Sequence, residues 1–172
     1  MALIAILAAD DFEDVELTTP RASLLEAGHA VDVIGAEAGD GIVGKQGTRI
    51  STDRAIAEAD PAEYDALVLP GGYSPDHLRT DPAMVGFVAA MAAAGKPVAA
   101  ICHAPWLLIE ADLVADRTLT SWPSLRTDLA NAGAEWVDEE LVVDDNLITS
   151  RNPGDIPVFV EAILHSIGSP AR

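Results

Sequence analysis

Short apolar runs alternate along the chain with longer stretches in which apolar and polar residues mix. A short, mostly unbroken apolar run is typical of a strand that is buried on both faces, and four such runs lie at 3–9, 31–36, 66–70 and 97–102. The stretches 13–27 and 81–95 predict helices, because a glycine closes each of them. This succession predicts an α/β fold in which helices cover both faces of a mostly parallel sheet.

Two further segments predict hairpins that are accessories to this framework. Residues 41–52 place β-type residues between glycines, and residues 140–150 carry an Asp-Asn pair between two apolar runs. Asp155 is expected to cap a final helix that ends near Ile167. No repeat or linker divides the sequence, so we expect residues 1–172 to form a single domain.

The first hairpin segment contains a glycine pattern that also occurs in phosphate-binding loops. Gly39, Gly41 and Gly44 have the spacing G-x-G-x-x-G, and the residues up to Lys45 follow a P-loop pattern. Both motifs require that a helix follow, since the helix N-terminus binds the phosphate. The residues that follow are β-like, and Gln46 replaces the Ser or Thr that would hold Mg²⁺. We therefore interpret these glycines as part of a hairpin.

Composition narrows the range of partners and compartments. Ten Lys and Arg residues against 28 Asp and Glu residues give a net charge of −18 at pH 7, which repels nucleic-acid backbones and anionic membrane surfaces. We expect neither nucleic acid nor membrane as a partner. The apolar N-terminus lacks the basic segment of a signal peptide, so it is interpreted as the first strand. A single cysteine, Cys102, forms no intrachain disulfide, which fits a cytoplasmic protein.

Cys102 is the candidate nucleophile. It ends the strand predicted at 97–102, and residues 104–110 predict a helix with Pro105 in an early position. A side chain at such a strand-to-helix turn lies exposed above the carboxyl edge of the sheet. The positive end of the helix favours the thiolate, so we expect the pKa of Cys102 to lie below its ordinary value of about 8.5. The alternative interpretation is a core cysteine, because free cysteines are often buried.

Two glycines and two glutamates at the ends of other predicted strands favour the catalytic interpretation. The N–H groups of Gly71 and Gly72, together with those after the cysteine, are candidates for an oxyanion hole. Glu13 and Glu16 have the spacing i, i+3 and share one helix face near the same edge of the sheet. A carboxyl group beside the thiol must be largely protonated to donate a hydrogen bond to the thiolate, and burial would raise its pKa. His103 directly follows the cysteine and is the candidate proton shuttle.

No metal and no organic cofactor is expected. Four histidines without ligand-type spacing and one thiol do not make a metal site. His29 and His165 are interpreted as structural and His77 as a surface residue. Trp106 and Trp122 are candidates for pocket walls, although helix packing explains either of them equally well.

These residues, in this order, resemble the PfpI-type intracellular proteases of the ThiJ/PfpI superfamily. The resemblance extends from residue 1 to the C-terminal helix and rests on FEDVEL (12–17), LEAGHAVDV (25–33), YDALVLPGG (64–72), GKPVAAICHAP (95–105), NAGAEWVDEELVVDDN (131–146) and ITSRNP (148–153). It implies a flavodoxin-like three-layer α/β sandwich that forms a homodimer or hexamer and carries its site around Cys102.

The resemblance also implies roles for single residues. Glu16 would hydrogen-bond Cys102, with Glu13 close by, and Asp76 would reach His103 of a neighbouring subunit to complete a triad across the interface. Archaeal members of the family carry Glu, Tyr and Gly where this chain has Asp76, Trp122 and Ala104.

Three classes of function are consistent with this reading. The first is a cysteine-dependent stress-response hydrolase, a peptidase or a deglycase, that acts on a peptide or a small carbonyl substrate. With methylglyoxal or glyoxal the same residues would make a glyoxalase that needs no cofactor. The second is a non-catalytic redox sensor, in which Cys102 is oxidised to a sulfinate held by Glu16. A chaperone-like holdase is the third, supported only by the acidic surface and by the oligomers of the family.

Overall fold

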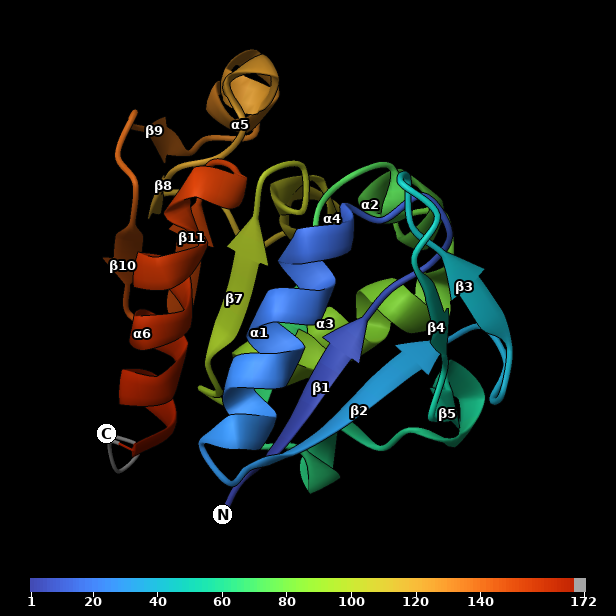
Figure 1. Ribbon diagram of the computed structural model, residues 1–172. Helices are drawn as coiled ribbons and strands as arrows, with labels where there is room; N and C mark the ends of the chain where they lie inside the picture. The colour runs from blue at the N-terminus through green and yellow to red at the C-terminus, as the bar shows by residue number, and fades with distance from the viewer. Residues whose placement is uncertain (169–172) are drawn as a thin grey trace.

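Seven strands form the central sheet of the computed structural model, which describes residues 1–168 (Figure 1). Their order across the sheet is β10-β11-β7-β6-β1-β2-β5, and every neighbouring pair is parallel except β10 and β11. The strands are β1 (Leu3–Leu7), β2 (Ala30–Gly35), β5 (Arg54–Ala55), β6 (Ala66–Leu69), β7 (Val98–Ile101), β10 (Val142–Asp144) and β11 (Leu147–Ser150). The mostly parallel sheet predicted from the sequence is confirmed.

Helices cover both faces of this sheet, as the flavodoxin-like prediction requires. In Figure 1, α1 and α6 lie in front of the sheet and α3 lies behind it. The helices are α1 (Asp14–Glu26), α2 (Ser74–Leu78), α3 (Pro82–Ala93), α4 (Pro105–Glu110), α5 (Arg126–Asn131) and α6 (Ile156–Gly168). Short 3-10 turns lie at Ile56–Glu58, Pro61–Glu63, Pro123–Leu125 and Pro153–Asp155.

The two faces of the sheet bury two separate apolar cores. Alternate side chains of β1 point to opposite faces: Ala5 and Leu7 pack in one core, and Ile4 and Ile6 pack in the other. Because helices cover both faces, neither set of side chains meets water. This is why the sequence of the strand is apolar without alternation.

The helix ends follow the signals in the sequence. Gly28 and Gly95 have φ angles of 86° and 71°, a conformation that a residue with a side chain rarely adopts. At the start of α3, the Asp81 side chain accepts a hydrogen bond from the N–H of Ala83. Asp155 is different from its prediction, because its carboxylate binds the guanidinium and the N–H of Arg151 in the loop before α6.

The two predicted hairpins differ in how they relate to the central sheet. Strands β3 (Gly41–Val43) and β4 (Arg49–Ser51) form a separate two-stranded sheet, so the hairpin interpretation of the glycine pattern is confirmed. The second hairpin is not an accessory. Its strand β11 pairs in parallel with β7 and is buried along its whole length, so it belongs to the central sheet. The sequence showed the turn but not the partner, because the partner strand lies far away along the chain.

One small unit was not predicted from the sequence. Strands β8 (Thr118–Leu119) and β9 (Glu135–Trp136) form a parallel pair, and α5 lies between them in the sequence. Strands this short have too few residues to show an apolar period. The unit lies at the end of the molecule toward which the strand arrows of β1 and β7 point (Figure 1).

The turn of the β3–β4 hairpin is built around the carboxylate of Asp14. The N–H groups of Gln46 and Thr48 donate to its two oxygens, each over 2.9 Å. A Cβ on Gly44 would lie 2.6 Å from the same carboxylate, so this position requires glycine. Burial raises the pKa of Asp14, but these hydrogen bonds outweigh burial and lower it.

Replacing Asp14 by asparagine is therefore expected to lower the free energy of unfolding by about 1–3 kcal/mol at neutral pH. The amide carries no charge and presents a donor to one of the two N–H groups. Urea denaturation measures the loss. Because the folded-state pKa of Asp14 is lowered, the difference from wild type should shrink as the pH falls below the ordinary carboxyl range. Asp10→Asn removes a similar but exposed contact with the N–H of Val43 and serves as the control; equal losses in both variants would contradict this account.

Candidate active site

Cys102 is the first residue after β7, at the carboxyl edge of the sheet. Its φ angle of 64° lies in the left-handed region, which is strained for a residue with a side chain. The chain then enters α4 at Pro105, so the predicted strand-to-helix turn is present. Cys102 as a whole residue is only 7% exposed, but it lines a cavity of about 280 Å³. The thiol is therefore not sealed in the core.

Glu16 lies in the first turn of α1 and is fully buried against the cysteine. Its Oε2 accepts a hydrogen bond of 2.8 Å from the N–H of Gly71. Its other oxygen, Oε1, is buried and has no protein hydrogen-bond partner that meets ordinary geometry within residues 1–168. The side chains of Glu16 and Cys102 nevertheless act on each other, since each changes the pKa of the other.

Gly71 and Gly72, which follow β6, have different roles in the site. A Cβ on Gly71 would lie 2.6 Å from Glu16 Oε2 and 2.7 Å from Cys102 Cβ, so only glycine lets these side chains meet. Because its N–H is bound by Glu16, Gly71 does not offer that group to an oxyanion, contrary to the expectation from the sequence. The N–H groups of Gly72 and His103 are the ones that favour the thiolate, since both lower the pKa of Cys102.

Cys102 and Glu16 form a buried pair. Ionising both side chains at once is unfavourable, because two negative charges would then lie close together. Burial raises the pKa of Glu16 to about 7. Burial and the charge of ionised Glu16 raise the pKa of Cys102 to about 12, and the N–H groups of Gly72 and His103 oppose this rise. The direction is opposite to the lowered pKa expected from the helix terminus alone. The thiolate therefore forms most easily when Glu16 holds the shared proton.

His103 lies beside the sulfur and is fixed by two tryptophans. Its Nδ1 is 3.2 Å from Cys102 Sγ. The Trp122 ring stacks on the imidazole with centroids 6.1 Å apart, and the Trp106 ring meets it edge-on at 5.1 Å. Burial, followed by the positive charge of Lys45, lowers the pKa of His103. The imidazole is therefore neutral near pH 7.

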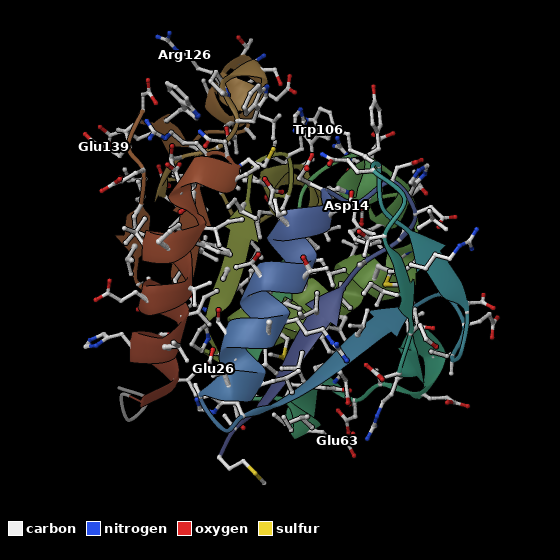
Figure 2. All side chains as sticks on the ribbon, viewed as in Figure 1. Asp14, Glu26, Glu63, Trp106, Arg126 and Glu139 are labelled. Atoms are coloured by element: carbon white, nitrogen blue, oxygen red, sulfur yellow. The ribbon has the colours of Figure 1, made fainter. Side chains whose placement is uncertain are left out.

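The walls of the pocket come from several elements that are far apart in the sequence. Trp106, which lines the pocket, lies at the same end of the molecule as Asp14, and both are labelled in Figure 2. The residues lining it are Glu13, Lys45, Gly72, Tyr73, Cys102, His103, Trp106, Trp122 and Pro153. Glu13 binds Lys45 Nζ over 3.2 Å and Gln46 Nε2 over 3.3 Å, so it fixes the hairpin tip against the pocket.

Asp76 is the predicted site residue that the structure does not bring to the pocket of its own chain. It lies on α2 with an exposed side chain. It lines a separate depression together with Arg79 and Glu110. A contact between Asp76 and His103 of a neighbouring subunit stays a prediction.

Two residues near the reacting groups were missed by the sequence reasoning. Lys45 enters the pocket from the hairpin tip, at the position where the P-loop pattern was set aside. Ser124 Oγ lies 3.3 Å from His103 Nε2. A lysine after the glycine pattern was a visible signal, although for a different kind of site. The sequence around Ser124 contains no motif that predicts a site residue, because the position of Ser124 depends on how the segment after β8 folds back over the site.

Comparison with known proteins now adds to this geometry. A family model described as the DJ-1/PfpI family matches residues 2–166. The chain belongs to the DJ-1/PfpI family. The resemblance noted from the sequence motifs is thereby confirmed.

Two relatives with functional names match nearly the whole chain. Protein/nucleic acid deglycase 2 of Escherichia coli (strain K12) is 48% identical over 168 residues, which cover 96% of this chain and 98% of the relative. The Bacillus subtilis (strain 168) protein named "Putative cysteine protease YraA" is 46% identical over 156 residues, covering 91% and 92%.

Solved structures of the DJ-1/PfpI family share the fold. A two-domain protein from Anabaena variabilis with DJ-1/ThiJ/PfpI-like and ferritin-like domains superposes with a TM-score of 0.96 at 43% identity; the match covers 98% of this chain and 48% of that one. This chain thus spans about half of that protein. Drosophila melanogaster DJ-1beta gives a TM-score of 0.90 at 28% identity, covering 98% and 91%.

Residues 1–168 contain neither a metal-ligand cluster nor a membrane-spanning helix. Within residues 1–168, no three His, Cys, Asp or Glu side chains are grouped so that they could hold a metal ion. In the same range, no helix has the length and apolar composition needed to cross a bilayer.

Proposed function

We propose that this DJ-1/PfpI protein is a cysteine-dependent hydrolase that removes small oxoaldehyde adducts from amines, a deglycase. One observation carries the proposal: Cys102 lies on a small pocket between an acid that shares its proton, Glu16, and a neutral imidazole, His103. The names of the two relatives, a deglycase and a cysteine protease, support a hydrolase that acts through this residue.

The geometry supports the following course of reaction. The Cys102 sulfur displaces the amine from the carbinol carbon of the adduct and forms a hemithioacetal, and the N–H groups of Gly72 and His103 are the candidates to hold the oxygen on that carbon. The thiol proton passes to Glu16 or to His103 Nδ1. The same groups return a proton to the departing amine. A proton then moves from the sulfur-bearing carbon to the neighbouring ketone carbon, so that the first carbon is oxidised to a thioester while the second is reduced to an alcohol in the same molecule. Water hydrolyses the thioester, which releases the hydroxy acid and the thiol. For a methylglyoxal adduct, one water is consumed, and one amine and one lactate are formed.

The size of the pocket favours a deglycase over a peptidase. A volume of about 280 Å³ lies just below the range of about 300–1,000 Å³ that is usual for small-molecule sites. It accommodates a three-carbon adduct, whereas an extended peptide needs a groove with several subsites. Trp106 and Trp122 enclose the pocket beside the sulfur.

The test separates the adduct from the free aldehyde. Lactate release is measured from methylglyoxal mixed with increasing N-acetyl-lysine, while free methylglyoxal is held constant. A deglycase gives a rate that rises with the adduct, and unfolded casein stays intact. A rate that follows free methylglyoxal alone would assign a glyoxalase instead. Cleavage of casein without lactate would assign a peptidase. Either of these two results would contradict the proposal.

The redox-sensor interpretation is less well supported by the site. Oxidation by peroxide begins at the thiolate, and burial together with ionised Glu16 raises the pKa of Cys102. Mild peroxide followed by mass spectrometry measures this directly. We expect slow addition of two oxygens to Cys102 at neutral pH.

A further inference from the structure

The imidazole of His103 lies between two heteroatoms of the same chain. Nδ1 is 3.2 Å from Cys102 Sγ, and Nε2 is 3.3 Å from Ser124 Oγ. Trp106 and Trp122 fix the plane of the ring from two sides. The remaining variable is therefore which of the two nitrogens carries the proton.

Ser124 is tied to the turn that holds the nucleophile. It belongs to the 3-10 turn Pro123–Leu125, which follows Trp122, and the N–H of Trp122 donates to the carbonyl oxygen of Cys102 over 2.9 Å. The cysteine, the imidazole and the serine are thus connected to one another by a short series of contacts. Among residues 1–168, Ser124 is the hydrogen-bond partner of Nε2, while Asp76 lies outside this pocket.

Accepting the proposed function, and following the route in which the thiol proton passes to His103 Nδ1, we propose that Ser124 is a positioning residue that holds the imidazole proton on Nε2. The hydroxyl oxygen of Ser124 accepts from Nε2–H, which leaves the Nδ1 lone pair directed at the sulfur. When the S–H proton moves to Nδ1, the products are a thiolate and an imidazolium. The Nε2–H bond to Ser124 then becomes charge-assisted and stronger, so the serine favours the transfer.

In this arrangement the neutral histidine donates its Nε2–H to the hydroxyl oxygen of Ser124, so the hydrogen bond needs no carboxylate as acceptor. Burial and Lys45 keep the imidazole neutral near pH 7, and a neutral imidazole carries one proton that either nitrogen can hold. A contact between Asp76 of another subunit and Nε2 would compete for the same N–H. The two partners are therefore distinguishable by substitution.

The experiment reads the tautomer directly, without substrate. Protein labelled with ¹⁵N-histidine is examined by two-bond ¹H–¹⁵N correlation near neutral pH, with His103→Gln used to assign the signals. We expect the His103 proton on Nε2 in wild type, a mixture of tautomers in Ser124→Ala, and the wild-type pattern in Ser124→Thr. In kinetics, Ser124→Ala should lower kcat roughly three- to tenfold with little change in KM, as loss of a hydrogen bond worth about 1 kcal/mol predicts, and Ser124→Thr should restore it.

Three results would overturn the inference. The first is a wild-type proton on Nδ1, and the second is an unchanged tautomer and kcat in Ser124→Ala. The third is loss of the tautomer preference in Asp76→Asn while Ser124→Ala keeps it, which would assign Nε2 to the neighbouring subunit. Failure of the proposed function looks different: deglycase activity would be absent in wild type while the tautomer still responds to Ser124.

Discussion

Replacing Cys102 by serine is expected to lower kcat/KM for the amine adduct of methylglyoxal by about a thousandfold or more, or about 4 kcal/mol of transition-state stabilisation. The hydroxyl has nearly the same size as the thiol but a far higher pKa, and the site offers no strong base to remove its proton. Glu16 and neutral His103 serve a thiol whose proton they can share. Lactate release under single-turnover conditions measures the loss.

The control for this variant is its fold. The serine occupies the same strained position, with a φ angle of 64° in wild type, so the thermal unfolding temperature should change by only a few degrees. Because the sequence has a single cysteine, loss of labelling by iodoacetamide verifies the substitution. If the serine variant kept a tenth of the activity, the nucleophile would have to be sought elsewhere.

Replacing Glu16 by glutamine is expected to remove a large pH dependence of stability. The folded-state pKa is raised from 4.5 to about 7, so the folded protein keeps a proton that the unfolded chain has released. This contribution is complete below pH 4.5 and is lost as the pH rises to about 7. Over that interval wild type should lose about 3 kcal/mol relative to Glu16→Gln. Urea denaturation of both proteins at a series of pH values measures the difference.

Glu13→Gln is the matched control for this measurement. Glu13 is also an acid at the pocket, but it binds Lys45 and Gln46. The charge of Glu13 raises the pKa of Glu16 less than burial does, so its replacement should reproduce only a small part of the change between pH 4.5 and about 7. A flat difference between wild type and Glu16→Gln across that interval would show that the buried carboxyl does not hold the proton.

The same glutamine variant should separate thiol reactivity from catalysis. Loss of the negative charge removes one cause of the raised pKa of Cys102, so alkylation by iodoacetamide near neutral pH should become faster. Catalysis should become slower, since glutamine cannot take the thiol proton. Parallel changes in the two rates would argue that Glu16 only fixes the shape of the pocket.

Much of this site was visible in the sequence because its parts follow strands. Gly71 directly follows the run 66–70, Cys102 ends the run 97–102, and Glu16 lies in the segment after the run 3–9. Parallel strands bring their carboxyl ends to one edge of the sheet. The direction of the thiol pKa could not be inferred in this way. It depends on burial and on the distance between two side chains, and a sequence pattern encodes neither.

The sequence by itself determined the alternation of strands and helices, the glycines that close the helices, and the edge at which Cys102 lies, because these depend on local periodicity and on backbone conformation. Only the tertiary structure decided that β11 joins the central sheet, that Gly71 gives its N–H to Glu16, that Lys45 reaches the pocket and that Ser124 contacts His103. Such contacts join segments distant in the chain, and their formation depends on how the packed layers fit together in space.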